Sequence, residues 1–111
     1  MEVDIQVTRV VSMEIDEVLE RRDVSQLTEA FGKLESPGAV RAFLVDLCTP
    51  REICDLAQRL EVARLLDEGE PYVEVQARTG ASSTTVSRVS KALNGRWGGY
   101  RDVLVKLEDD R

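Results

Sequence analysis

Apolar residues recur at helical spacing through most of the chain, and the clearest pattern lies in residues 72–93. The sequence there, YVEVQARTGASSTTVSRVSKAL, predicts two short helices joined by a tight turn. We expect the first helix to end at Thr79, because Gly80 permits the positive φ that a tight turn needs. The second helix is expected to begin at Ser82 or Ser83. Small apolar residues would wedge the two helices together, namely Val75, Ala81, Val86 and Val89.

The other face of the second helix carries hydroxyl and cationic side chains and no acid: Ser82, Ser83, Thr84, Thr85, Ser87, Arg88 and Lys91. Apolar residues six and nine positions after the turn glycine have the spacing of a helix-turn-helix. In that motif the second helix enters the major groove of DNA. Any amphipathic helix pair with a glycine turn gives a similar string, so a purely structural role stays open beside DNA binding.

Three helices are predicted before this motif. One follows Met13, a second follows Asp23, which would cap it with Gln26 three residues later, and a third follows Ser36-Pro37, a capping serine with a proline at the first helical position. Their apolar stripes are Ile15, Val18 and Leu19; Leu27, Ala30, Phe31 and Leu34; and Val40, Phe43, Leu44 and Leu47. Residues 1–12 alternate weakly like a strand. A flexible tail and a true start at Met13 are both open interpretations there.

A longer platform helix is predicted from Thr49-Pro50-Arg51-Glu52, which combines a capping box with a proline at the first helical position. It should reach about Glu68 and stop at Gly69. One apolar face comprises Ile53, Leu56, Ala57, Leu60 and Ala63, and Val62, Leu65 and Leu66 widen it. A helix that is apolar on two sides is buried on two sides. In so short a chain, we expect the second partner to be another subunit.

The segment 94–100 contains three glycines, but no strand precedes it and no Gly-Lys-Ser/Thr follows, so a phosphate-cradling loop is not indicated. We expect a flexible connection in which Trp97 and Tyr100 pack on the core or on a second subunit, with Arg96 a candidate phosphate contact. A final helix is predicted over about Tyr100–Leu107, with Val103, Leu104 and Leu107 inward.

Charge changes this picture. The whole chain has 111 residues, which predicts one domain with a modest core, and a formal net charge of −6. Residues 82–107, however, contain five basic residues and one acid. Because the local sign of the charge decides what approaches a surface, the negative net charge of the whole chain does not exclude DNA binding. The modest core makes dimerisation a natural supplement.

Other chemistries are poorly represented. There is no histidine, and the two cysteines, Cys48 and Cys54, lie in apolar surroundings and are expected to be buried, reduced thiols. No nucleophile stands beside a base, so we expect neither an enzyme nor a cofactor. No apolar run approaches a membrane span and no signal-peptide pattern opens the chain. We therefore expect a soluble, cytoplasmic protein.

Four segments together resemble the Trp repressor-related family of YerC/YecD type: residues 46–52 (DLCTPRE), 57–63 (AQRLEVA), 79–82 (TGAS) and 86–89 (VSRV). The similarity covers roughly Ser25–Leu107. It implies an all-α, Trp repressor-like domain over residues 25–107, an intertwined dimer and a role in transcriptional regulation. Residues 1–24 would then be an N-terminal extension, a tail or an extra helix, and residues 108–111 an acidic tail.

The resemblance also suggests a candidate effector pocket. Tryptophan repressor holds its amino-acid corepressor between the platform and recognition helices, and the two arginines that flank the indole correspond to Arg59 and Arg88 here. A threonine of that pocket corresponds to Thr49. A glycine corresponds to Val89, whose side chain would project into the place of the indole, so tryptophan is not expected to bind. Alternatively, Arg59 and Arg88 serve an ion pair and a phosphate contact.

One more departure concerns Gln76, which stands where such motifs usually carry a small alanine. A buried glutamine there would need a partner, or the register of the first helix would be shifted by one residue.

The expected function is therefore sequence-specific binding of double-stranded DNA by a homodimer, as a transcriptional regulator and most simply a repressor, on a near-palindromic site. Ser82 and Ser83 would hold phosphate with the helix amides. The side chains expected to contact base edges are Thr84, Thr85, Ser87 and Arg88. Those expected to contact the DNA backbone are Lys91 and Arg96. Two other functions stay open, a protein-interaction adaptor and a sensor of a metabolite other than tryptophan.

Overall fold

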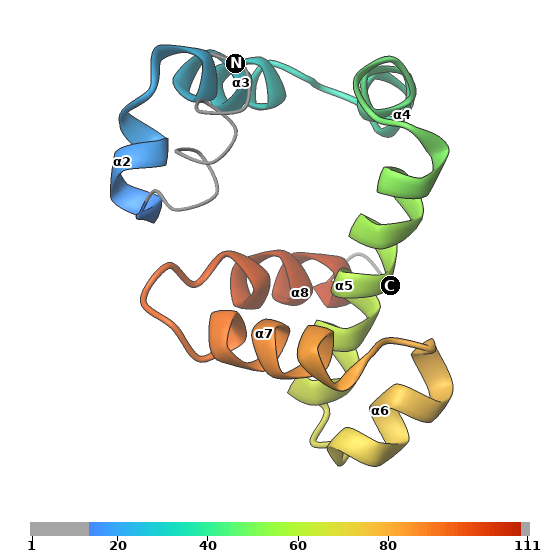
Figure 1. Ribbon diagram of the computed structural model, residues 1–111. Helices are drawn as coiled ribbons and strands as arrows, with labels where there is room; N and C mark the ends of the chain where they lie inside the picture. Colours follow the sequence, from blue (N-terminus) through green and yellow to red (C-terminus); the bar gives the residue numbers. More distant parts are fainter. Residues whose placement is uncertain (1–13, 110–111) are drawn as a thin grey trace, which may run out of the picture. The chain divides into compact units, whose positions relative to one another are not determined.

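A computed structural model describes residues 14–109, and these residues form seven helices and no strand (Figure 1). The all-α prediction is confirmed. The expectations for residues 1–12 lie outside the described residues. In chain order, the helices are α2 (Ile15–Glu20), α3 (Arg22–Gly32), α4 (Pro37–Leu47), α5 (Pro50–Asp67), α6 (Tyr72–Thr79), α7 (Ser83–Leu93) and α8 (Gly99–Asp109). Their contacts divide the chain into one unit that ends at Leu44 and a second that begins at Val45.

In the first unit, α2 packs on α3, and the rings of Phe31 and Phe43 meet edge to face with centroids 5.1 Å apart. The predicted cap at Asp23 is wrong, because Arg21 occupies the N-cap position and gives no side-chain cap. Asp23 lies in the first turn instead, where the Arg21 guanidinium donates two hydrogen bonds to its carboxylate, at 3.0 and 2.7 Å. That pairing lowers the pKa of Asp23. Because α3 already begins at Arg22, Asp23 lies inside the helix and not at the position before it.

The other two predicted helix starts are confirmed. Ser36 lies immediately before α4, and its Oγ accepts the N–H of Ala39 in the first turn of that helix (3.1 Å). At α5, the Glu52 N–H donates to Thr49 Oγ1 (3.1 Å) and the Thr49 N–H donates to Glu52 Oε1 (2.8 Å), which completes the capping box. The helix ends before Gly69, whose φ of 89° requires the left-handed region that glycine favours.

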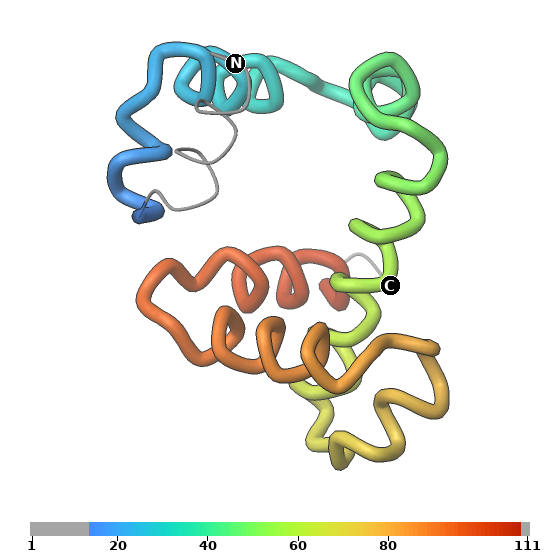
Figure 2. The backbone as a smooth tube through the Cα atoms, viewed as in Figure 1, coloured from blue at the N-terminus to red at the C-terminus, as the bar shows by residue number. Residues whose placement is uncertain are grey.

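The second unit contains the core. The α5 helix packs against α6, α7 and α8, and the backbone trace shows α7 and α8 running alongside one another (Figure 2). The buried apolar side chains come from the C-terminal half of α5 and from the elements after it: Val62, Ala63, Leu65, Val75, Ala81, Val86, Val89, Leu93 and Leu104. Leu60, Leu66 and Tyr100 pack against this cluster. The predicted inward positions of the motif are therefore confirmed.

The N-terminal half of α5 is different, because it contributes no buried residue. Leu56, predicted to face inward, is 45% exposed. The prediction of buried thiols is wrong in the described chain: both cysteines are free, but Cys48 is half-buried and Cys54 is exposed. Helices α2, α3 and α4 likewise contain no buried residue. A large apolar surface of the described chain is therefore left without a partner.

The last helix, α8, begins one residue before and ends two residues after its predicted bounds. Within residues 14–109, none of the helices combines the length and the apolar character that a membrane crossing requires.

Candidate nucleic-acid interface

The turn between α6 and α7 is held by hydrogen bonds that start from Thr79. Its hydroxyl donates to the Val75 carbonyl (2.7 Å) and accepts the Ala81 N–H (3.1 Å). The Gly80 N–H donates to the Gln76 carbonyl (2.9 Å), and the φ of Gly80 is 74°. A residue with a Cβ would be strained at that φ. The turn is thus fixed by its own residues where the sequence predicted it.

The two helices of the motif are joined through small apolar side chains. Val75, Val86 and Val89 are buried, as is Ala81 in the turn. Gln76 is only half-buried, and none of the described residues has a buried side-chain polar atom without a partner. The predicted register of the first helix therefore holds, and the glutamine needs no buried partner.

The first turn of α7 is capped by Ser82. Its Oγ accepts the Thr85 N–H at 3.1 Å, and the Ser82 hydroxyl donates to Thr85 Oγ1, also at 3.1 Å. Capping satisfies one of the four amides that begin a helix without intrahelical partners. The amides that remain, together with the helix dipole, form a site that favours an anion.

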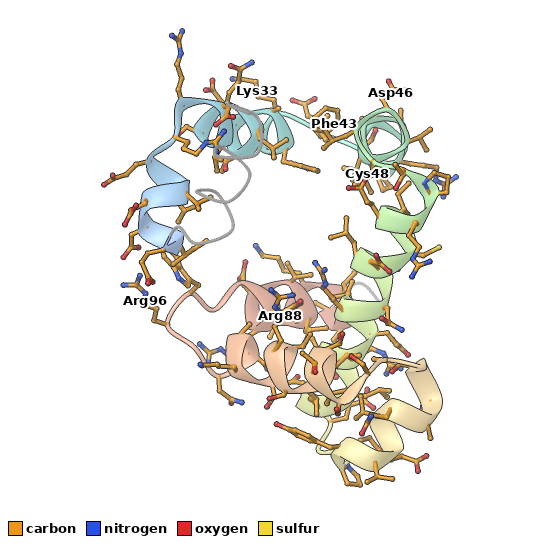
Figure 3. All side chains as sticks on the ribbon, viewed as in Figure 1. Lys33, Phe43, Asp46, Cys48, Arg88 and Arg96 are labelled. Carbon is orange, nitrogen blue, oxygen red and sulfur yellow. The ribbon has the colours of Figure 1, made fainter. Side chains whose placement is uncertain are left out.

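The outward face of α7 contains no acidic residue, and most of its predicted contact residues are exposed: Ser82, Ser83, Thr84, Ser87, Arg88 and Lys91. Thr85, the remaining predicted contact of α7, is half-buried, and its Oγ1 accepts a hydrogen bond from the Ser82 hydroxyl. Arg88 projects from α7 (Figure 3). It makes no hydrogen bond or ion pair with the residues that the structure describes, so its guanidinium is available to an external acceptor.

Arg96 and Trp97 lie in the loop between α7 and α8, and Figure 3 shows Arg96 there. The Arg96 guanidinium stands over the indole at 4.9 Å from the ring centroid, within cation–π range. Trp97 is 61% exposed, so it does not pack on the core of the described chain, and its packing on a second subunit stays a prediction. Tyr100 does pack on the core. The loop is closed by Arg101, whose Nη2 donates to the Gly95 carbonyl at 3.1 Å.

The four candidate effector residues lie on two helices that pack together. Thr49 and Arg59 belong to the start and middle of α5, and Arg88 and Val89 belong to α7. The Thr49 hydroxyl is occupied by the capping box, and Val89 is a core residue. Neither arginine forms an ion pair within residues 14–109. A cavity of about 110 Å³ beside α8 and a groove of about 350 Å³ at the end of α5 are lined by none of the four.

Two ionised groups of α5 are held by local hydrogen bonds. The Thr49 backbone N–H lowers the pKa of Glu52 by binding its carboxylate. The hydrogen bonds that Arg64 donates to Glu61, at 2.8 and 2.7 Å, raise the pKa of that guanidinium, and Glu68 accepts a further one.

One residue of this region escaped the sequence analysis. Gln58 on α5 donates from Nε2 to the Thr79 carbonyl at 3.1 Å, a side-chain bond that spans 21 positions. The only feature of the sequence that could have pointed to this contact is a glutamine amide next to Ala57, within the apolar stretch of the platform helix. Periodicity alone does not reveal which carbonyl such an amide will meet.

Known proteins resemble this chain over most of its length. Residues 22–108 match the family model described as Trp repressor protein. The chain is 40% identical over 97 residues to the uncharacterized protein YerC of Bacillus subtilis (strain 168), a match that covers 87% of this chain and 92% of that protein.

Solved structures agree with the sequence matches. The crystal structure of a TrpR-like protein from Eubacterium eligens ATCC 27750 superposes with a TM-score of 0.75 at 38% identity, covering 83% of this chain and 95% of that one. A structure from Staphylococcus aureus gives a TM-score of 0.76 at 34% identity and covers 87% and 96%. The chain therefore belongs to the Trp repressor family of helix-turn-helix DNA-binding regulators, and within it to the proteins of YerC type.

Proposed function

We propose that this protein is a sequence-specific transcriptional regulator that binds double-stranded DNA as a homodimer and represses the genes beside its operator. The observation that carries the proposal is the outward face of α7, which is exposed, hydroxyl-rich and free of acids, on a helix whose other face is fixed in the core by Val86, Val89 and Leu93. Such a helix can enter a major groove without charge repulsion and without losing its own packing.

Different parts of α7 would do different work. The free amides at its start and the Ser83 hydroxyl would hold a phosphate and fix the orientation of the helix, with Ser82 as the cap that keeps this turn in place. Thr84, Ser87 and Arg88 would contact base edges, with Arg88 suited to a bidentate bond with guanine. Thr85 would contribute less than its exposed neighbours, because its side chain is half-buried. Lys91 and Arg96 would contact the DNA backbone.

A second copy of the chain is the partner that the exposed apolar surface supports. The core described above draws on residues 62–104, whereas α2, α3 and α4 bury no side chain, and Leu56 and Leu47 stay about half exposed. Two copies that exchange these helices in an intertwined dimer would cover that surface. The two-fold axis would set the α7 helices roughly 34 Å apart, one turn of the duplex, which requires a near-palindromic operator.

Tryptophan is not the effector in this proposal. Val89 stands at the position that the family resemblance assigns to a glycine beside the indole, and its side chain is part of the core. The Thr49 hydroxyl is engaged with the Glu52 amide. A thermal-shift measurement with millimolar tryptophan should leave the unfolding midpoint unchanged, because a ligand that binds the folded state raises it. Applied to other amino acids and to nucleotides, the same screen tests for a different effector.

The proposal is tested by recovering genomic DNA fragments that the purified protein retains, and by measuring the affinity of the enriched sequence at several salt concentrations. We expect a near-palindromic site, and we expect the logarithm of the binding constant to fall linearly with the logarithm of the salt concentration. A reporter gene under that site should be expressed more strongly when the protein is deleted. If no DNA sequence is enriched and any DNA binding does not change with salt concentration, the results would instead support a protein-interaction adaptor.

A further inference from the structure

The Gln58–Thr79 hydrogen bond joins the platform helix directly to the turn of the motif. Gln58 lies on α5, where its Nε2 donates to the carbonyl of the last residue of α6, at 3.1 Å and partly shielded from solvent. The last carbonyls of a helix have no intrahelical donor. Gln58 therefore supplies from another helix a bond that α6 cannot make for itself.

The position of this bond matters more than its strength. Its acceptor residue, Thr79, also binds Val75 and Ala81 through its hydroxyl, and the next residue is the glycine with positive φ. Three residues after Thr79, Ser82 caps α7. The direction in which α7 leaves the turn is thus set within a few bonds of the carbonyl that Gln58 holds.

We propose that Gln58 is a positioning residue for DNA recognition, which fixes the angle of α7 on the platform by holding the Thr79 carbonyl. The inference rests on the proposed function, because it concerns how the same α7 face is aligned with base edges. Base contacts require accurate placement, whereas contacts with the uniform phosphate backbone tolerate a small rotation. Loss of the bond should therefore reduce the preference for the operator more than it reduces binding to random DNA.

A packing role for the Gln58 side chain makes a different prediction. If the side chain only fills space, Gln58→Leu preserves most of its volume and should leave operator preference intact. If its amide positions the turn, Gln58→Leu leaves the Thr79 carbonyl without its donor, and the operator preference should fall by up to about 5- to 10-fold per protomer, the equivalent of one typical hydrogen bond.

Gln58→Glu adds a readout that packing alone would not move. The ionised carboxyl at this position has no proton to donate and faces a carbonyl oxygen, whereas the protonated carboxyl can donate as the amide does. Partial burial beside a carbonyl raises a carboxyl pKa above its ordinary value of about 4.3. Operator preference should accordingly be low at pH 7.5 and recover toward that of the natural protein as the pH falls to 5.

The experiment compares the natural full-length chain, Gln58→Leu, Gln58→Glu and the control Gln26→Glu, which adds the same charge on α3. Affinities for the selected operator and for random duplex are measured by fluorescence anisotropy between pH 5 and 7.5, and the thermal midpoint is recorded for each variant. We expect both Gln58 variants to have a lower ratio of operator affinity to random-duplex affinity. We expect this ratio to recover at low pH only for Gln58→Glu.

The possible failures are distinguishable. If the natural protein itself shows no preference for any DNA, the proposed function is wrong and the role of Gln58 falls with it. If the natural protein prefers its operator and the Gln58 variants keep the same ratio, or if the pH profile of Gln58→Glu matches that of Gln26→Glu, the positioning role is wrong while the proposed function stands.

Discussion

Replacing Arg88 by alanine is the perturbation that bears most directly on how α7 contacts DNA. The side chain is exposed and makes no hydrogen bond or ion pair with the described residues. Its removal should therefore change the free energy of unfolding by no more than about 0.5 kcal/mol, as is usual for surface substitutions. A loss of DNA binding in this variant can then be attributed to the interface and not to the fold.

The size of the loss follows from the proposed contact. A bidentate bond between arginine and guanine contributes about 1–3 kcal/mol of discrimination. A homodimer carries the substitution twice, so the complete operator should lose about 2–6 kcal/mol, which is about thirtyfold or more in affinity. If Arg88 contacts phosphate instead, affinity falls equally on all sequences and the slope of log K against log salt decreases by about 0.9 per protomer.

The assay is a titration of operator and random duplexes by anisotropy at several salt concentrations. Arg51→Ala is a charge-matched control, because Arg51 is also exposed but lies at the start of α5. We expect Arg88→Ala to lose operator affinity selectively and Arg51→Ala to retain it. Equal affinities of the two variants for the operator would refute a contact between Arg88 and DNA.

Further predictions concern stability and assembly. Thr49→Ala should reduce the free energy of unfolding in urea by about 0.5–2 kcal/mol, because it removes the N-cap of α5, whereas Thr49→Ser should retain it. Because the Thr49 amide lowers the pKa of Glu52, the contribution of that carboxylate is complete above the ordinary carboxyl pKa of about 4.3 and is lost as the pH falls through the folded value; Glu52→Gln should flatten this part of the stability–pH curve. Val75→Ala should reduce the free energy of unfolding by about 1–3 kcal/mol, since the Val75 side chain is 0% exposed. Val73→Ala on the same helix should reduce it by less than ~0.5 kcal/mol, since Val73 is 78% exposed. Leu56→Asp should shift the protein toward monomers in sedimentation velocity while Val73→Asp should not, and an unchanged dimer would place the interface elsewhere.

Local rules were sufficient for much of the second unit. The Thr49 capping box, the Gly80 turn and the Ser82 cap each depend on residues within a few positions of one another, so spacing alone predicts them. The buried positions of α6 and α7 followed from helical periodicity. The Trp repressor family was recognisable for the same reason, since its segments lie in these locally determined elements.

Tertiary context decided the remaining features. Asp23 does not cap α3 because the helix begins earlier, at Arg22, and Asp23 pairs with Arg21 from within the first turn. Cys54 and Trp97 are apolar in character but stay exposed in the described chain, because periodicity predicts an inward face without saying which molecule covers it. The contact between Gln58 and Thr79 joins residues 21 positions apart and requires the helix packing itself.

The central claim is that two copies of the chain present their α7 helices to successive major grooves of one operator. Hydroxyl-radical and methylation-protection footprinting of the selected operator tests it most directly. The account predicts two protected major-groove segments with centres 10–10.5 base pairs apart, related by two-fold symmetry. A single protected segment, or protection confined to the minor groove, would contradict it.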